Sequence, residues 1–151
     1  HKLGSLKVLM KEVDLFVAND GEARAISGET NLIQAARSLR KLGPRWIVVK
    51  KGEHGVLFYC DQFMFSFPAY PVDRVVDPTG AGDTFAGGLM GYLCKARKVN
   101  ENTLKKAVIY ATTIASFNVE GFGMAKTAPL TMAAVHQRMR TFLKFMHPGR
   151  G

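Results

Sequence analysis

Apolar residues in the first half of the chain recur with two different periods. Spacings of three and four residues predict amphipathic helices, whereas short apolar runs and strict alternation predict strands. Thr30 or Asn31 can cap the third of these helices. The predicted helices lie at 3–13, 22–26 and 31–41. The predicted strands lie at 15–18, 46–49, 56–59 and 63–67, and the last two form an antiparallel hairpin.

The second half of the chain has mostly helical spacing. Pro129 and Thr131 are typical of the start of the last helix. The predicted helices lie at 84–94, 103–119 and 132–143. A strand, a helix, a strand, a hairpin and then helices are typical of an α/β fold with a partly parallel sheet.

Composition narrows the class of protein. A length of 151 residues is typical of one domain, and we expect a single domain over 1–151. The chain is 47% apolar and 22% charged, which excludes disorder, collagen-like repeats and a disulfide-dense miniprotein. Cys60 and Cys94 have no metal-binding spacing, so we expect two unpaired thiols.

The net charge of +9 suggests an anionic partner. That partner could be a nucleic acid, a membrane surface or a phosphorylated small molecule. No run of five or six like charges occurs, and we expect neither nucleic-acid nor membrane binding. No apolar run is long enough to span a membrane, and no signal-peptide pattern opens the chain, so we expect a cytoplasmic location.

The segment 75–88, with the sequence VVDPTGAGDTFAGG, carries the clearest chemical pattern. An extended approach meets a turn of small residues, and a helix then begins near Asp83. Backbone amides at a helix start are unpaired, and the helix dipole places partial positive charge there. This arrangement predicts a phosphate site. A carboxylate beside a phosphate makes sense if Asp83 takes the proton of an attacking hydroxyl.

Two alternatives remain for this segment from the residues alone. Asp83 could simply stabilise the start of the helix, and the glycines could simply make a tight turn. The segment is not a Walker A loop, because no Gly-Lys-Ser/Thr follows, and it is not a dinucleotide fingerprint.

The string from Asp77 to Gly88 resembles the signature of the ribokinase-like, or PfkB, family of carbohydrate and nucleoside kinases. The resemblance extends from about 14 to about 129 and corresponds to the C-terminal portion of such kinases. It implies part of a three-layer α/β/α fold with a mostly parallel sheet and a hairpin. It also implies ATP-dependent phosphoryl transfer to a hydroxyl of a sugar or nucleoside, with magnesium (Mg2+) and an activating potassium ion (K+).

The resemblance assigns roles to residues of this loop. Asp83 is implied as the catalytic base, and the amides of Gly80, Ala81 and Gly82 as the anion hole. Asp77 and the carbonyl of Thr79 are implied as ligands of the monovalent cation. From the residues alone Asp77 could equally form an Asx-type turn, and the two roles are compatible.

Two further segments resemble family motifs. Asn19 and Glu22 follow a predicted strand and resemble the motif that organises magnesium and phosphates, with Glu22 acting partly through water. The alternative is a turn residue and a helix-stabilising glutamate. The segment 49–56 resembles the nucleotide loop, with Lys50, Lys51, Gly52, Glu53 and Gly55 as ATP-binding residues.

The helix predicted at 103–119 corresponds to the family's adenine-lining helix, which implies Thr112 as the neighbour of the base. The turn after it implies Val119 and Gly123 as further cation ligands. We interpret His54 as exposed, and the phenylalanines at 63, 65 and 67 as hairpin core rather than a stacking platform for nucleotides.

The family's acceptor-binding and lid residues lie in an N-terminal portion without a counterpart before Asp14. We therefore expect weak or absent kinase activity from this chain alone. The alternative is a nucleotide-binding or assembly module without turnover, which could pair with a second copy as a homo-oligomer. The acceptor itself is not identified.

Overall fold

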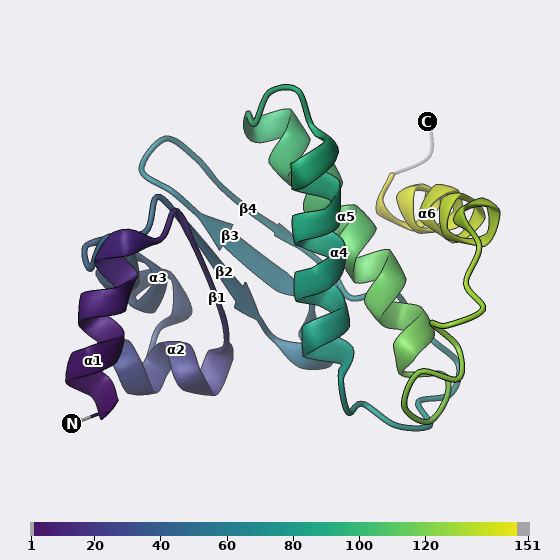
Figure 1. Cartoon of the computed structure of the whole chain (residues 1–151), viewed down its shortest axis with the longest axis horizontal. Helices are drawn as coiled ribbons and strands as arrows, with labels where there is room; N and C mark the ends of the chain where they lie inside the picture. The colour runs from purple at the N-terminus through teal and green to yellow at the C-terminus, as the bar shows by residue number, and fades with distance from the viewer. Residues whose placement is uncertain (1, 148–151) are drawn as a thin grey trace. The chain divides into compact units, whose positions relative to one another are not determined.

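The computed structural model describes residues 2–147, which divide into two compact units at Ala69 and Tyr70 (Figure 1). The first unit contains the helices α1 (Lys2–Leu9), α2 (Asp20–Ser27) and α3 (Leu32–Arg40), and the short 3-10 turns η1 (Met10–Glu12) and η2 (Gly52–His54). Its strands are β1 (Leu15–Asn19), β2 (Trp46–Lys50), β3 (Val56–Tyr59) and β4 (Met64–Phe67). Each element predicted for this region is present, with ends that differ by a few residues.

The four strands form one sheet in the order β1-β2-β3-β4. The pair β1–β2 is parallel, whereas β2–β3 and β3–β4 are antiparallel. The sheet in the described residues is therefore mixed, and the expected predominance of parallel pairs is corrected. The physical reason is that short connections join β2 to β3 and β3 to β4, and the chain reverses its direction at each of them.

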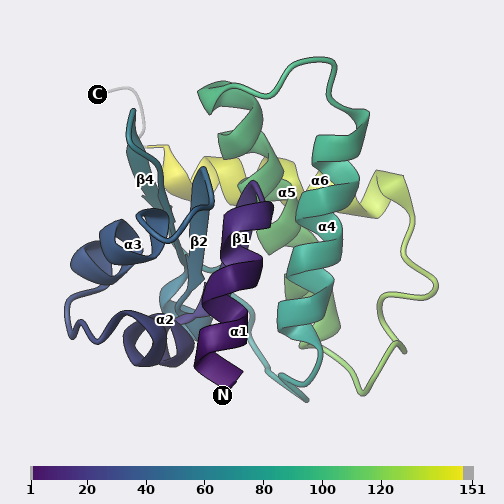
Figure 2. The ribbon, with the colours of Figure 1, turned by 60° about the vertical axis from the view of Figure 1, so that its left-hand side comes forward.

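Helices α2 and α3 cover one face of this sheet (Figures 1 and 2). Small side chains on both helices let their backbones approach the strands closely, and the apolar side chains of β2 and β3 complete the core. A buried apolar side chain of this kind contributes about 1.5–3 kcal/mol to folding. The buried residues of this core are Met10, Ala23, Ala35, Ala36, Leu39, Ile47, Val49 and Leu57.

Aromatic rings stack along the hairpin. The ring of Phe58 lies 4.7 Å from that of Phe65 and 5.6 Å from that of Phe63, and Phe65 lies 5.2 Å from Phe67. Phe58 is buried. Phe63, Phe65 and Phe67 are themselves half-buried, so their part in a hairpin core stays a prediction.

The second unit contains the helices α4 (Ala81–Lys95), α5 (Glu101–Asn118) and α6 (Met132–Met146). Asn100 and Thr131 cap α5 and α6 through their side-chain oxygens. Helices α4 and α5 are antiparallel and pack closely. A Cβ atom added at Gly88 would lie 3.2 Å from the Cα of Ala111, so a larger residue there would push the two helices apart by a few tenths of an ångström.

Helix α6 is tied to α5 by Arg138. Its guanidinium donates hydrogen bonds to Ser116 at 3.0 Å and to both carboxylate oxygens of Glu120 at 2.9 and 3.2 Å. The same group lies 3.5 Å from the ring centre of Phe117. Both bonds to Glu120 come from one nitrogen, Nη2, and these charge-assisted contacts join α6 to the turn that follows α5.

Cys60 is buried and Cys94 is exposed, and both are free thiols, as expected. Within residues 2–147, no helix combines the length and the apolar character that a membrane crossing requires.

Candidate functional site

The loop before α4 forms a tight, left-handed turn. Gly80 is the N-cap residue of α4 and has a φ of 79°, a conformation that strongly favours glycine. The Thr84 amide donates to the Gly80 carbonyl at 2.9 Å, which is the first regular helical hydrogen bond. No side chain caps this helix start. The backbone conformation of this turn therefore requires the glycine at position 80.

The amides of this first turn differ in their partners. The Ala81 amide donates to the Pro78 carbonyl at 3.2 Å, so it already has an acceptor within the chain. Among the described residues, nothing accepts a hydrogen bond from the amides of Gly82 and Asp83. Unpaired amides at the positive end of a helix dipole are suited to an anion.

Asp83 lies in the first turn of α4, and its side chain is exposed. Across residues 2–147, no donor or cation contacts its carboxylate. An aspartate in this position is placed beside the two unpaired amides but remains open to an incoming hydroxyl group.

Asp77 closes an Asx turn at the other end of the loop. Its Oδ1 accepts a hydrogen bond from the Thr79 amide at 2.9 Å. This hydrogen bond holds the pKa of Asp77 below its ordinary value of 3.8, because the ionised form is the better acceptor. The Asx turn that the residues alone allow is confirmed.

Asn118 and Val119, at the end of α5, hold this loop through hydrogen bonds that the sequence did not predict. The side-chain amide of Asn118 donates to the Thr79 carbonyl at 2.8 Å, and its oxygen accepts from the Thr84 hydroxyl at 3.1 Å. The Val119 carbonyl accepts from the amides of Val76 at 2.7 Å and Asp77 at 3.3 Å. The sequence signal that could have indicated this role is Asn118, a polar residue at the end of a largely apolar helix face.

In the first unit, Asn19 and Glu22 form a capping box at the start of α2. The Glu22 amide donates to Asn19 Oδ1 at 2.7 Å, and the Asn19 amide donates to Glu22 Oε2 at 2.8 Å. Both side chains are exposed. In this structure the pair therefore acts as a turn residue and a helix-stabilising glutamate. Glu22 retains one carboxylate oxygen for a ligand.

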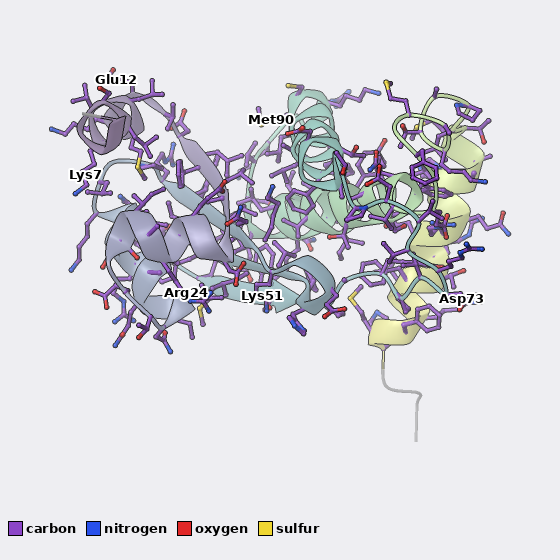
Figure 3. The ribbon with its side chains drawn as sticks, turned by 90° about the horizontal axis from the view of Figure 1, so that it is seen from below. Lys7, Glu12, Arg24, Lys51, Asp73 and Met90 are labelled. Carbon is purple, nitrogen blue, oxygen red and sulfur yellow. The ribbon has the colours of Figure 1, made fainter. Side chains whose placement is uncertain are left out.

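The candidate nucleotide loop follows β2. The Lys51 amide donates to the Gly55 carbonyl at 2.7 Å, and the Lys51 ammonium donates to Ser66 Oγ of β4 at 3.3 Å (Figure 3). Gly55 has a φ of 90°, and a Cβ atom there would lie 2.0 Å from the Phe67 carbonyl oxygen. Glu53 and His54 are exposed, as expected for His54.

The parallel pairing of β1 and β2 brings two of these segments together. Asn19 and Lys50 are partners in the register, at the carboxyl end of each strand. Ligands of α/β sheets bind outside the carboxyl ends of parallel strands. Within the first unit, the capping-box segment (Asn19 and Glu22) and the lysine segment (Lys50 and Lys51) therefore lie together at the carboxyl ends of the parallel strands.

Thr112 is 8% exposed in the middle of α5.

A separate groove of about 890 Å³ lies between α4, α5 and α6, and its basic side chains are Lys95, Arg97, Lys98, Lys106 and His136. None of the predicted site residues lines this groove. Within residues 2–147, no three His, Cys, Asp or Glu side chains cluster closely enough to hold a metal ion.

The α/β fold and a glycine loop that leads to an exposed aspartate at a helix start are the arrangement that the ribokinase-like resemblance implies. The sequence model of the pfkB family of carbohydrate kinases matches residues 2–130. The chain belongs to this family.

Curated relatives of the chain are sugar and nucleoside kinases. The chain is 38% identical over 98 residues to the cytidine kinase of Thermococcus kodakarensis, which is 64% of this chain and 35% of that enzyme. It is 35% identical over 121 residues to the deoxyribokinase of Salmonella typhi, which is 77% of this chain and 38% of that enzyme. The chain thus spans little more than a third of these relatives.

Solved structures show that the fold is ribokinase-like. The aminoimidazole riboside kinase of Salmonella enterica, solved with aminoimidazole riboside and an ATP analogue, superposes with a TM-score of 0.81 at 28% identity. The match covers 91% of this chain and 46% of that enzyme. The ribokinase of Thermotoga maritima matches with a TM-score of 0.73 at 27% identity, over 91% of this chain and 44% of that protein.

Proposed function

We propose that this chain carries the nucleotide and phosphate-transfer part of a kinase that moves the γ-phosphoryl group of ATP to a hydroxyl of a sugar or nucleoside. The observation that carries the proposal is the start of α4. Two amides without an acceptor and an exposed carboxylate lie within consecutive residues 82 and 83, at the positive end of the helix. The riboside and ATP analogue in the related Salmonella kinase support the choice of substrates.

In the proposed reaction, Asp83 accepts the proton of the acceptor hydroxyl. The oxygen then bonds to the γ-phosphorus, while the bond from that phosphorus to the bridging oxygen breaks and ADP leaves. The amides of Gly80, Gly82 and Asp83 stabilise the charge that gathers on the phosphoryl oxygens. The Ala81 amide contributes less than the sequence implies, because it already donates to Pro78.

Residues of the first unit are also proposed to contact the nucleotide. Lys50 and Lys51 offset phosphate charge, and the loop of Gly52, Glu53 and Gly55 lets the nucleotide pass close to the backbone. The capping-box segment, Asn19 and Glu22, lies at the same edge of the sheet. Thr112 in α5 is the proposed neighbour of the adenine.

The described residues could hold magnesium only together with the phosphates of a bound nucleotide. Magnesium prefers oxygen ligands, keeps several waters and is commonly held by substrate phosphates with one or two carboxylates. Glu22 has one carboxylate oxygen that the capping box does not use. The Asp77 carboxylate and the Thr79 carbonyl suit a monovalent cation such as K+, which would neutralise charge beside the anion hole.

The experiment that tests the proposal measures phosphate transfer from γ-labelled ATP to a panel of sugars and nucleosides. Any turnover by the chain should fall by about two to four orders of magnitude in Asp83→Asn, the typical range for loss of a general base. ATP affinity, measured by calorimetry, should stay within about twofold, because the backbone amides remain. Asp73→Asn is the matched control, since Asp73 is an exposed acid ten residues earlier (Figure 3). Substantial turnover by Asp83→Asn would show that Asp83 is not the base.

A second candidate is nucleotide binding without turnover. The observation that favours it is that, of the site residues identified in the described part of the chain, Asp83 alone is assigned to the acceptor hydroxyl, and the others would face nucleotide, phosphate or cation. ATP binding by the chain without transfer to any acceptor would support this candidate. Absence of ATP binding would overturn both.

A further inference from the structure

We propose that the groove between α4, α5 and α6 is a docking site for an acidic amphipathic helix of a partner protein. The groove lies within the second unit, and none of the residues assigned to phosphate, nucleotide or cation lines it. The proposal therefore adds an interaction surface to the chain and does not depend on the proposed function.

The groove carries charge of one sign. No described aspartate or glutamate lines it, whereas its basic side chains are Lys95, Arg97, Lys98, Lys106 and His136. All five are exposed, and none forms an ion pair with a described residue. Cations that converge on a concave surface attract a partner of opposite charge and raise its rate of association. The occupant is therefore expected to be anionic.

The two ends of the groove differ in polarity. Since α4 and α5 are antiparallel, the end of α4 meets the start of α5, and the lysines and the arginine lie there. Further along α5 the lining is apolar: Ile114 comes from α5, and Met132 and Met139 come from α6, which packs beside it (Figure 1). The Tyr110 hydroxyl contacts Met132 Sδ at 3.6 Å, which places α6 at this end. A matching occupant is acidic at one end and apolar at the other.

The length and the walls of the groove suit a helix. Its lining on α5 extends from Asn102 to Ile114, which is about 18 Å, or roughly three turns. On α4, Gly87 and Gly91 line it one turn apart, and a Cβ atom added at either would meet nothing within 4 Å. Glycine inside a helix is less favourable than alanine, and no contact among the described residues requires it here. Bare backbone on this wall lets another helix approach to the usual interaxial distance of about 8–10 Å.

An amphipathic helix uses both ends of the groove. A nucleic acid would pair with the cations but would leave the apolar end uncovered, and an uncharged apolar segment would do the reverse. Apolar side chains of a helix recur every three or four residues and would lie against α5 and α6. Acidic residues in its first turn would meet the cations and also stabilise the start of the helix itself.

The experiment measures the binding of a labelled peptide to the full chain by fluorescence anisotropy. The peptide has about 14 residues, with glutamates in its first turn and leucines at every third or fourth later position, so that its helix matches the length of the groove. Polyglutamate of the same charge and a single-stranded DNA oligonucleotide are the comparison probes. We expect the amphipathic peptide to bind at least about tenfold more tightly than either, because it also buries apolar side chains.

Charge reversal tests the cationic end. Lys98→Glu combined with Lys106→Glu should weaken peptide binding by about tenfold, since each exposed ion pair contributes up to about fivefold. The matched control is Arg140→Glu combined with Lys144→Glu, at exposed positions of α6 outside the groove. The control has the same net charge, so a general effect of charge would weaken binding equally in both.

Filling the groove tests its shape. Gly91→Leu should weaken peptide binding by at least about tenfold, while the urea midpoint stays the same or rises, because leucine is the better helix former. Ala133→Leu, at an exposed position of α6 outside the groove, is the matched control. This variant separates blocked docking from lost folding.

Weaker binding in both groove variants, with both controls like the wild type, would support the proposal. No binding of the amphipathic peptide, equal binding of the three probes, or full binding by Gly91→Leu would overturn it. Sedimentation checks for a second copy as the occupant. A dimer of the chain that the peptide dissociates would assign the groove to self-association and would also overturn the proposal.

Discussion

The substitution Gly55→Ala tests how the candidate nucleotide loop is built. Gly55 has a φ of 90°, and a Cβ atom there would lie 2.0 Å from the Phe67 carbonyl oxygen and 2.7 Å from the Pro68 carbonyl carbon. These neighbours are backbone atoms, so they cannot rotate away. The backbone of β4 or of the loop must therefore move.

The expected cost has two parts. A positive φ for a residue with a Cβ atom costs about 1–2 kcal/mol. Overpacking against fixed neighbours adds typically about 1–3 kcal/mol. Gly28→Ala is the matched control, because Gly28 has a φ of 76° but nothing within 4 Å of the added atom. The control has only the first cost, so the two variants should differ by about 1–3 kcal/mol.

Urea unfolding measures this difference. Trp46, the single tryptophan of the sequence, lies in β2 and reports on the first unit by its fluorescence. With a slope of about 2 kcal/mol per molar urea, a 2 kcal/mol difference moves the midpoint by about 1 M. Equal midpoints for Gly55→Ala and Gly28→Ala would refute the close approach of β4 to this loop.

Two further predictions concern the second unit and are measured by circular dichroism in urea. The ionised Asp77 carboxylate is stabilised in the folded state, so its contribution is present above pH 3.8 and is lost as the pH falls through the lower folded-state pKa. The difference in midpoint between the wild type and Asp77→Ala should therefore narrow below pH 3.8, and a constant difference down to pH 2 would contradict this. Arg138→Met should cost about 2 kcal/mol, because it leaves the partly buried Glu120 without its partner. Glu120→Gln should cost less, and an unchanged midpoint for Arg138→Met would argue against this link between α5 and α6.

The sequence was most informative where the local pattern decides the structure. The strand predicted at 56–59 is β3 as observed, and the helix predicted at 103–119 is α5, Glu101–Asn118. Asn31 caps α3 through its side-chain oxygen, as one of two predicted caps. Such features depend on neighbouring residues, because propensity, capping and hydrophobic period act over a few residues.

Contacts between distant segments could not be predicted in the same way. Asn118 meets Thr79 and Thr84 only after α4 and α5 have packed, 39 and 34 residues away in the sequence. The use of the Ala81 amide by Pro78 depends on the exact turn that Gly80 adopts. The capping box at Asn19 was open to two interpretations, because the same residue types serve a helix start and a ligand.

The crossing of α4 and α5 also constrains how this sequence can change in length. Gly88 contacts Ala111, and Thr84 contacts Asn118, so the two pairs lie along one seam between the helices. Seven residues separate Ala111 from Asn118, which is close to two helical turns. Insertion or deletion of a single residue between them would rotate Asn118 by about 100° and remove it from the loop. We therefore expect this stretch of α5 to tolerate exchanges of side chains far better than any change in the number of residues.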